Sequence, residues 1–244
     1  MASPANIGLL LIFLSFLGVA YLFLNMFMAI KQRGLIVWIA FINVAIFVYM
    51  ALFNPALISK YALSYSKVAS GMGYTLLSYM FVHANLAHIT LNTFGLLFFG
   101  YNMEKEFGAA PTLMVYLVSG IIAGAAFIIS SSPASMVVGA SGAIFGLMAY
   151  LTLVRPFQIT PMPFFIPMPV ALATVLYAVL VVPVFASGNI SSFGNVAQSA
   201  HIGGLVGGSL MAFAMNYAQA LKGLIIVLIT AAIVLLMPTI LSAL

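Results

Sequence analysis

The chain has 244 residues, of which 65% are hydrophobic and only 4% charged, a composition that rules out a soluble globular domain. At about 20 apolar residues per transmembrane helix, this content would supply roughly eight spans with short connections. Glu104 and Glu106 are the only acids and cysteine is absent, which excludes paired intramembrane aspartates, disulfides, thiolate nucleophiles and cysteine metal sites. The seven lysines and arginines are scattered along the chain, so nucleic acid is not an expected partner.

Apolar stretches between polar breaks predict an all-α polytopic membrane protein with roughly eight spans. In chain order we expect helices near residues 7–30, 35–53, 75–101, 111–130, 139–154, 168–186, 199–219 and 224–242. The first stretch has no basic segment before it and is longer than the apolar part of a signal peptide, so we expect an uncleaved span. No long internal repeat is found, which gives an inverted-repeat transporter little support.

Basic residues predict the orientation of these spans. Lys31 and Arg33 follow the first span, and placing them in the cytoplasm puts the N-terminus outside. Successive crossings then place Lys105, Arg155 and Lys222 in the cytoplasm as well.

Two longer connections lie outside in this orientation. Residues 54–74 mix Lys60, Lys67, tyrosines and serines with apolar residues, which suits a segment at the membrane interface. Residues 187–198 form a polar, glycine-containing run that is typical of a loop.

Polar side chains inside a membrane are costly and are candidates for function, which singles out His83, His88, Asn92, Ser141 and His201. At 1.5 Å per residue, His88, Ser141 and His201 lie roughly 21 to 23 Å above the cytoplasmic polar ends of their helices. In a hydrocarbon core about 30 Å thick, these three groups share one level near the outer surface.

Spacing along the helices indicates which of these groups act together. His88 and Asn92 are four positions apart and share a helix face. His83 and His88 are five apart and would diverge by about 140° on one helix, so we expect His83 not to join them directly.

Small residues flank both the serine and the last histidine. Ser141 lies in Gly139-Ala140-Ser141-Gly142, and Gly142 is followed four positions later by another glycine. The same spacing recurs twice just after His201. Because small residues at this spacing let helix backbones approach closely, we expect Ser141 and His201 to come within hydrogen-bonding range.

These groups predict nucleophilic catalysis by a dyad. A serine needs a neighbouring base, and the neutral imidazole of His201 is the available one. A carboxylate third member is lacking, because the two glutamates lie at the cytoplasmic end of a helix. The oxyanion formed by attack on an amide would be stabilised by His88, the Asn92 amide and the Ser141 backbone N–H.

The three segments that carry these residues resemble the signature segments of the rhomboid intramembrane serine proteases. They are His83-x4-His88-x3-Asn92, Gly139-Ala140-Ser141-Gly142 and Ala200-His201-Ile202-Gly203-Gly204, and they occur in the family's order. The resemblance implies a six-helix catalytic core over 35–220, with an extra helix in 1–34 and another in 221–244.

The resemblance also implies roles for individual residues. Ser141 would be the nucleophile, His201 the general base, and His88 and Asn92 the oxyanion donors. His83, Gly139, Gly142 and Phe145 would support the site. Phe145 stands where well-studied relatives have a tyrosine that packs on the catalytic histidine, and Glu104 matches a structural glutamate at the end of the second core helix.

The activity implied is hydrolysis of peptide bonds in or near transmembrane segments of other proteins, without cofactor or metal. The expected partners are such substrates and the lipid bilayer, and the oligomeric state stays open. The resemblance makes the helix at 168–186, weakened by Pro167, Pro169 and Pro183, the gate, and the loop at 187–198 the cap. We expect a prokaryotic plasma membrane and a site open to the extracytoplasmic side.

The first outer loop also departs from the family pattern, as Phe145 does. Many rhomboids carry Trp-Arg in the first outer loop, but the only tryptophan here is Trp38, inside a predicted helix. The sequence alone therefore does not say how residues 54–74 are anchored.

Other interpretations of the same residues stay open. An inactive rhomboid-like protein would bind transmembrane clients without cutting them. A small-solute channel or transporter would use the histidines as a proton path. A zinc site built from the three histidines is less favoured, because His83 and His88 are expected to diverge and a His-Glu-x-x-His pattern is lacking.

Overall fold

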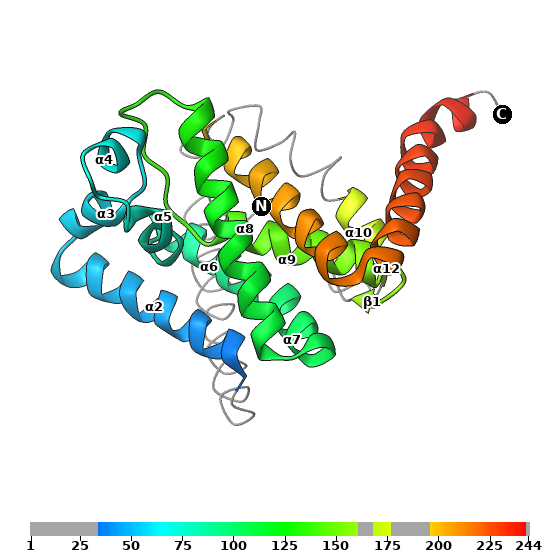
Figure 1. The fold of residues 1–244 in the computed structure, drawn as a ribbon, viewed down its shortest axis with the longest axis horizontal. Helices are drawn as coiled ribbons and strands as arrows, with labels where there is room; N and C mark the ends of the chain where they lie inside the picture. The colour runs from blue at the N-terminus through cyan, green and yellow to red at the C-terminus, as the bar shows by residue number, and fades with distance from the viewer. Residues whose placement is uncertain (1–33, 161–167, 177–195, 243–244) are drawn as a thin grey trace, which may run out of the picture.

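A computed structural model describes residues 34–160, 168–176 and 196–242 of the chain (Figure 1). The predicted first span near 7–30, nearly all of the predicted N-terminal addition 1–34, and residues 177–195 of the predicted gate and cap lie outside the described residues.

The described part is almost entirely helical. Its main helices are α2 (Leu35–Phe53), α6 (Leu86–Gly95), α8 (Ala109–Ser130), α9 (Ser141–Val154), α10 (Val170–Leu176) and α12 (Val196–Ser242). The shorter ones are α3 (Ala56–Tyr61), α4 (Tyr65–Ala69), α5 (Thr75–Ser78), the 3₁₀ turn η1 (Tyr79–Phe81), the π-helical segment η2 (Leu96–Gly100) and α7 (Tyr101–Phe107). Strands β1 (Ile159–Thr160) and β2 (Met168–Pro169) form one short antiparallel pair.

Three helices of the described residues are long and apolar enough to cross a membrane, namely α2, α8 and the stretch Gln198–Met237 of α12. The 14-residue α9 is apolar but shorter. The predicted class, a helical polytopic membrane protein, agrees with this arrangement, whereas the eight predicted spans exceed what the described residues contain.

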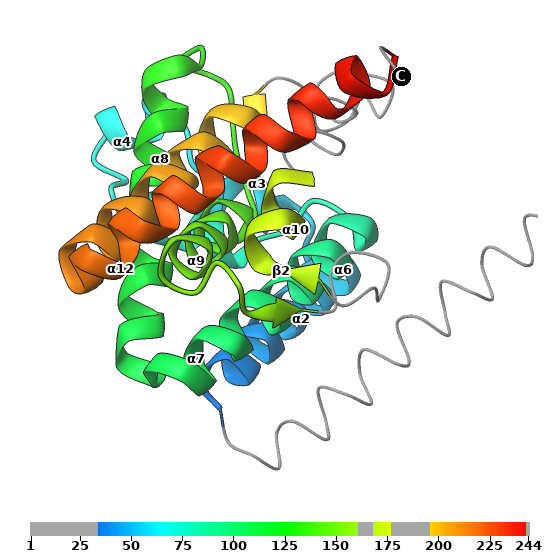
Figure 2. The same cartoon turned by 90° about the vertical axis from the view of Figure 1, so that its right-hand side faces the viewer.

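Helix α9 forms the centre of the fold. Every residue of α9 after Ser141 is buried, as expected for a helix that is apolar on all sides. Seen nearly end-on in Figure 2, α9 lies among α8, α12 and α10. The residue that begins this helix is therefore held by the best packed part of the molecule.

The single helix predicted for 75–101 is wrong. The chain instead forms α5 and η1, leaves helical structure at Val82, and begins α6 at Leu86. Asn85 caps the new helix, because its Oδ1 accepts the His88 N–H at 2.9 Å. The run Tyr79–Val82 is as apolar as a span, so hydropathy alone does not detect this break.

The two helices predicted for 199–219 and 224–242 form one element, α12, with a sharp break at Asn216. Asn216 has φ −146° and ψ 53°, and its side-chain amide donates to the Tyr150 hydroxyl at 2.5 Å. The chain reverses direction there, so that α12 has the shape of a V (Figure 1). The predicted break near Lys222 is therefore displaced towards the N-terminus.

One end of the bundle gathers the charged groups. The Glu104 carboxylate accepts the backbone N–H groups of Leu35 and Ile36 at 2.7 and 3.0 Å, which caps the start of α2. Arg155, after the last residue of α9, pairs with Glu106 at 2.8 Å. The start of α2 and the ends of α7 and α9 therefore lie at one end of the molecule, as the charge-based orientation predicts.

The connection 54–74 is anchored without Trp-Arg. Leu63 and Val137 exchange backbone hydrogen bonds of 3.0 and 2.9 Å, and the backbone and side chain of Ser66 both donate to the Pro133 carbonyl. The ammonium group of Lys67 donates to three carbonyl groups around the end of α3. These contacts fix the connection to the loop that leads into Ser141.

Candidate active site

Ser141 is the first residue of α9 and follows a tight turn. Gly139 in that turn has φ +116°, a conformation that residues with a Cβ rarely adopt, and its N–H donates to the Tyr79 carbonyl at 2.8 Å. The first N–H groups of a helix lack partners within the helix, so the turn delivers a half-buried hydroxyl beside available backbone donors.

His201 lies on the first arm of α12, and its Nε2 is 2.9 Å from the Ser141 Oγ. Close contact between the backbones of α9 and α12 makes this short distance possible. A Cβ added to Gly204 would clash with the Gly142 carbonyl, and one added to Gly208 would clash with the Gly146 carbonyl. The glycines singled out in the sequence thus line the α9–α12 contact beside the serine and histidine.

Phe145 lies one turn after Ser141 and stacks on His201. The two rings are 4.4 Å apart between centroids and inclined by 14°. The stacking expected from the resemblance is thus present although the residue is Phe rather than Tyr. It restricts the imidazole plane while its Nε2 faces the serine.

His88 lies against the turn before the serine. A Cβ built on Gly139 would lie 2.5 Å from the His88 Nε2, so the absence of a side chain there leaves room for the ring. The His88 Nδ1 accepts the Ala84 N–H at 3.5 Å. In a neutral imidazole this places the proton on Nε2, the atom that faces the turn.

Asn92 lies one turn further along α6 and is buried. Its Nδ2 donates to the His88 carbonyl at 2.9 Å, which fixes the amide beneath the histidine. Its Oδ1 has no hydrogen-bond partner among the described residues. The predicted sharing of one face by His88 and Asn92 is therefore confirmed.

His83 joins the cluster directly, contrary to the prediction. Its ring packs edge-on against His88, with centroids 5.1 Å apart, and its Nε2 accepts the Ala140 N–H at 3.5 Å. The 140° separation assumed a continuous helix, whereas His83 lies in the irregular segment before α6. The side chain is fully buried beside the turn that carries Ser141.

Sequence reasoning missed two residues that shape the site. Asn85 caps α6, and an asparagine just before an apolar helical run is a recognisable sign of a helix start. The Tyr79 carbonyl accepts a hydrogen bond from the Gly139 N–H, and the Tyr79 hydroxyl donates to the Gly120 carbonyl at 2.6 Å. Only the three-dimensional fold reveals the role of Tyr79.

Neither glutamate takes part in the site, because Glu104 caps α2 and Glu106 pairs with Arg155. Among residues 34–160, 168–176 and 196–242, no group of three or more His, Cys, Asp or Glu side chains is arranged to hold a metal ion. The arrangement offers a serine, a base and a set of N–H donors.

Comparison with known sequences identifies what the chain resembles. Residues 70–218, more than half of its length, match the Rhomboid domain family. The chain is 32% identical over 156 residues to the rhomboid protease GluP of Bacillus subtilis, a match that covers 64% of this chain and 28% of GluP.

Relatives from other organisms show the same similarity. The mitochondrial RHOMBOID-like protein 12 of Arabidopsis thaliana is 27% identical over 194 residues, covering 72% of this chain and 56% of that protein. The rhomboid-like protease 5 of Toxoplasma gondii is 32% identical over 164 residues, covering 66% and 18%. The match therefore spans between about a fifth and just over half of these relatives.

Proposed function

This chain belongs to the rhomboid family, and from that premise we propose that it is an intramembrane serine protease. It hydrolyses peptide bonds in or near the transmembrane segments of other membrane proteins. The observation that carries the proposal is the 2.9 Å separation between the Ser141 Oγ and the His201 Nε2. That distance lies within the range over which an imidazole removes a proton from a serine.

The reaction proceeds through an acyl-enzyme. As the Ser141 Oγ attacks the scissile carbonyl carbon, its proton passes to the His201 Nε2. His201 then gives this proton to the leaving amine as the C–N bond breaks, which leaves the acyl group on Ser141. Water, deprotonated by His201, attacks the ester and releases the carboxyl product, returning the proton to Ser141.

Three donors stabilise the oxyanion of each tetrahedral intermediate. The N–H of Ser141 points from the start of α9, and the His88 Nε2 carries its proton towards the turn at Gly139. Asn92 uses one amide hydrogen on the His88 carbonyl and has a second one to offer. Removing one such donor typically costs about 10²- to 10³-fold in kcat.

The dyad operates below the membrane surface. Helix α9 has 14 residues and is therefore about 21 Å long, whereas the hydrocarbon core is about 30 Å thick. With Arg155 at the cytoplasmic boundary, Ser141 lies roughly 9 Å below the opposite surface. Hydrolysis requires that water reach Ser141 from that side.

Substrates are transmembrane segments whose helix is locally weak. A scissile carbonyl in a regular helix accepts a hydrogen bond from the N–H four residues later, so glycine, proline or serine nearby makes it accessible. Substrates enter laterally past the helix that begins at Val170. The membrane we propose is the plasma membrane of a prokaryote, with the site open to the extracytoplasmic side.

Cleavage of defined substrates tests this proposal. The purified protein would be reconstituted with single-span fusion proteins whose outer half contains either a Gly-Pro-Ser segment or polyleucine. We expect cleavage of the former only, lost in Ser141→Ala and reduced on the order of a thousandfold or more in His201→Ala. Cleavage that persists in Ser141→Ala would contradict the proposal. Binding without cleavage by the wild-type protein would favour a client-binding function.

A further inference from the structure

An apolar groove of about 620 Å³ lies apart from the dyad, between α2 and the segments α3, α5 and η1. Apolar side chains such as Ile42, Leu57 and Phe81 form most of its wall. Ser78, one of its polar residues, already donates its hydroxyl to the Tyr61 carbonyl at 2.9 Å. The volume falls within the range of about 300 to 1,000 Å³ that is typical of ligand pockets.

The groove opens towards the lipid-facing side of α2. Ile42 and Tyr49 line it and remain 44% and 55% exposed on a helix that is long and apolar enough to span the membrane. Two of its lining residues are Tyr49 and Tyr61, and tyrosine is enriched at the membrane interface, which indicates that the groove lies at that level. Tyr49 packs on Phe53 and Tyr61 on Tyr74, with centroids 5.7 and 6.2 Å apart.

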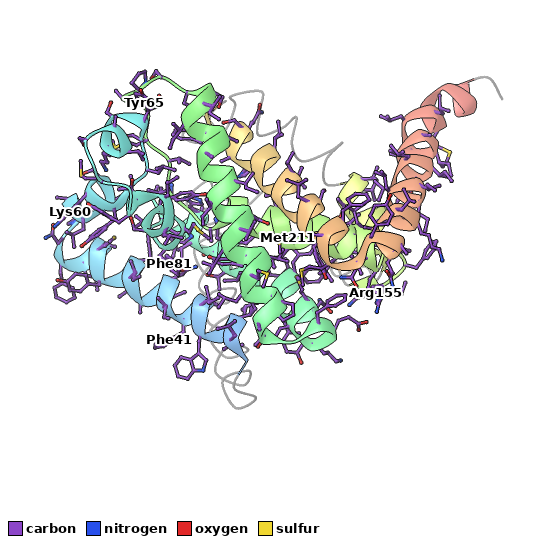
Figure 3. The ribbon with its side chains drawn as sticks, viewed as in Figure 1. Phe41, Lys60, Tyr65, Phe81, Arg155 and Met211 are labelled. Atoms are coloured by element: carbon purple, nitrogen blue, oxygen red, sulfur yellow. The ribbon has the colours of Figure 1, made fainter. Side chains whose placement is uncertain are left out.

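Positive charge lies at one edge of the groove. Lys60 is exposed next to the groove residue Tyr61, with its ammonium nitrogen 5.6 Å from the centroid of that ring (Figure 3). The two acids of the chain are far away, because Glu104 caps the opposite end of α2 and Glu106 pairs with Arg155. An anion at Lys60 would therefore meet no protein carboxylate.

We propose that this groove binds an anionic phospholipid, with an acyl chain along its apolar wall and the phosphate headgroup at Lys60. A flexible chain suits the space better than a protein helix does. An acyl chain can bend to follow the irregular wall formed by α2, α3, α5 and η1, which a straight helix cannot do. The interfacial level, the apolar wall and the uncompensated lysine together match the two ends of a phospholipid.

Photo-crosslinking with two lipid probes tests this site. The full-length protein would be reconstituted in phosphatidylcholine vesicles that contain either phosphatidylglycerol or phosphatidylcholine with a diazirine in the acyl chain. We expect the phosphatidylglycerol probe to label the peptides that line the groove about fivefold more, the factor expected for one lysine near an anionic headgroup. Replacing the exposed Lys60 (Lys60→Gln) should reduce this preference, while the Lys67 ammonium, which is held by carbonyl groups at the end of α3, remains.

A second pair of variants tests the apolar part of the groove separately from the charge at Lys60. Ala45 lines the groove from α2, so Ala45→Trp should reduce labelling by both probes, whereas Val48→Trp on the same helix should not. Lys222→Gln, at the charged end of the bundle, should keep the preference. Equal labelling by both probes, a preference that is unchanged in Lys60→Gln, or labelling that is unchanged in Ala45→Trp would overturn the proposal.

Discussion

At the scale of single residues, the site depends on a glycine that leaves room for a histidine. Gly139 combines φ +116° with the His88 ring at the position where a Cβ would be. In the same turn, the Gly139 N–H donates to the Tyr79 carbonyl, and the Ala140 N–H donates to the His83 Nε2. Several contacts therefore determine where the hydroxyl of Ser141 lies relative to the His83 and His88 side chains.

Gly139→Ala should abolish activity and destabilise the protein. A residue with a Cβ at positive φ costs about 1 to 3 kcal/mol, and this Cβ would also displace the His88 ring. Cleavage rate and thermal unfolding would be measured together. The matched control is Gly71→Ala, because Gly71 also has positive φ, +92°, but nothing lies within 4 Å of its Cβ position. Equal activity in both variants would contradict the role of the close contact.

The residues that meet at the site were predictable at this scale, because polar side chains are exceptions in an apolar chain. A serine and histidines with flanking glycines stand out against 65% hydrophobic residues. The position of His83 was missed, because it depends on whether the chain is helical between His83 and His88. Asn85 carried the missing signal, since a cap there means that His83 precedes the helix.

At the scale of elements, two kinds of contact hold the helices in register. The Glu104 carboxylate caps the start of α2 by accepting hydrogen bonds from the N–H groups of Leu35 and Ile36. Backbone contact at glycines joins α9 to α12. The first fixes the start of α2 to α7, and the second brings Ser141 and His201 together.

Glu104→Ala should destabilise the protein by about 1 to 2 kcal/mol, because two N–H groups at the start of α2 lose their acceptor. Glu104→Gln should retain part of the stability through its amide oxygen. Glu106→Ala is the control: its ion pair with Arg155 is exposed, so a change below about 1 kcal/mol is expected. Thermal unfolding in detergent measures all three, and a larger effect at Glu106 would contradict this assignment.

Gly208→Ala should separate α9 from α12, because the new Cβ would overlap the Gly146 carbonyl. We expect reduced thermal stability and loss of cleavage, because His201 on the same arm would move away from Ser141. The comparison is Gly73→Ala, where the added methyl group meets nothing within 4 Å. Wild-type activity in Gly208→Ala would show that the close approach is dispensable.

Helices formed by uninterrupted apolar runs were predictable from the sequence. The helix expected at 35–53 is α2 with the same bounds, and those expected at 111–130 and 139–154 differ from α8 and α9 by two residues at one end. The break near Val82 was missed and the break before the last helix was placed a few residues too late, because hydropathy does not register a capping asparagine or a reversal at the contact between Asn216 and Tyr150.

At the scale of the whole molecule, the fold separates two environments. The charged end holds Glu104, Glu106 and Arg155, while the Ser141 turn and the connection 54–74 lie towards the other end. Figure 1 shows α2 and α3 on one side of α8 and the second arm of α12 on the other. The positive-inside pattern predicted this polarity, because the scattered cations follow the helix ends.

The number of spans depends on more than apolar content. Composition supported roughly eight, whereas the described residues contain three candidate spans and the shorter α9. Buried elements of the core need not cross the whole membrane, since α9 is enclosed by its neighbours and α6 follows a capped loop. The predicted first span and residues 177–195 lie outside the described residues, so the number of eight spans stays a prediction.

The most direct test of the central claim is labelling of the purified wild-type protein by a fluorophosphonate, with the adduct mapped by mass spectrometry. An activated serine reacts, whereas a serine that only bridges helices does not. We predict a single adduct on Ser141 that is absent in Ser141→Ala and in His201→Ala, each checked for folding by thermal unfolding. A folded wild-type protein that remains unlabelled, or labelling that persists in His201→Ala, would contradict the dyad.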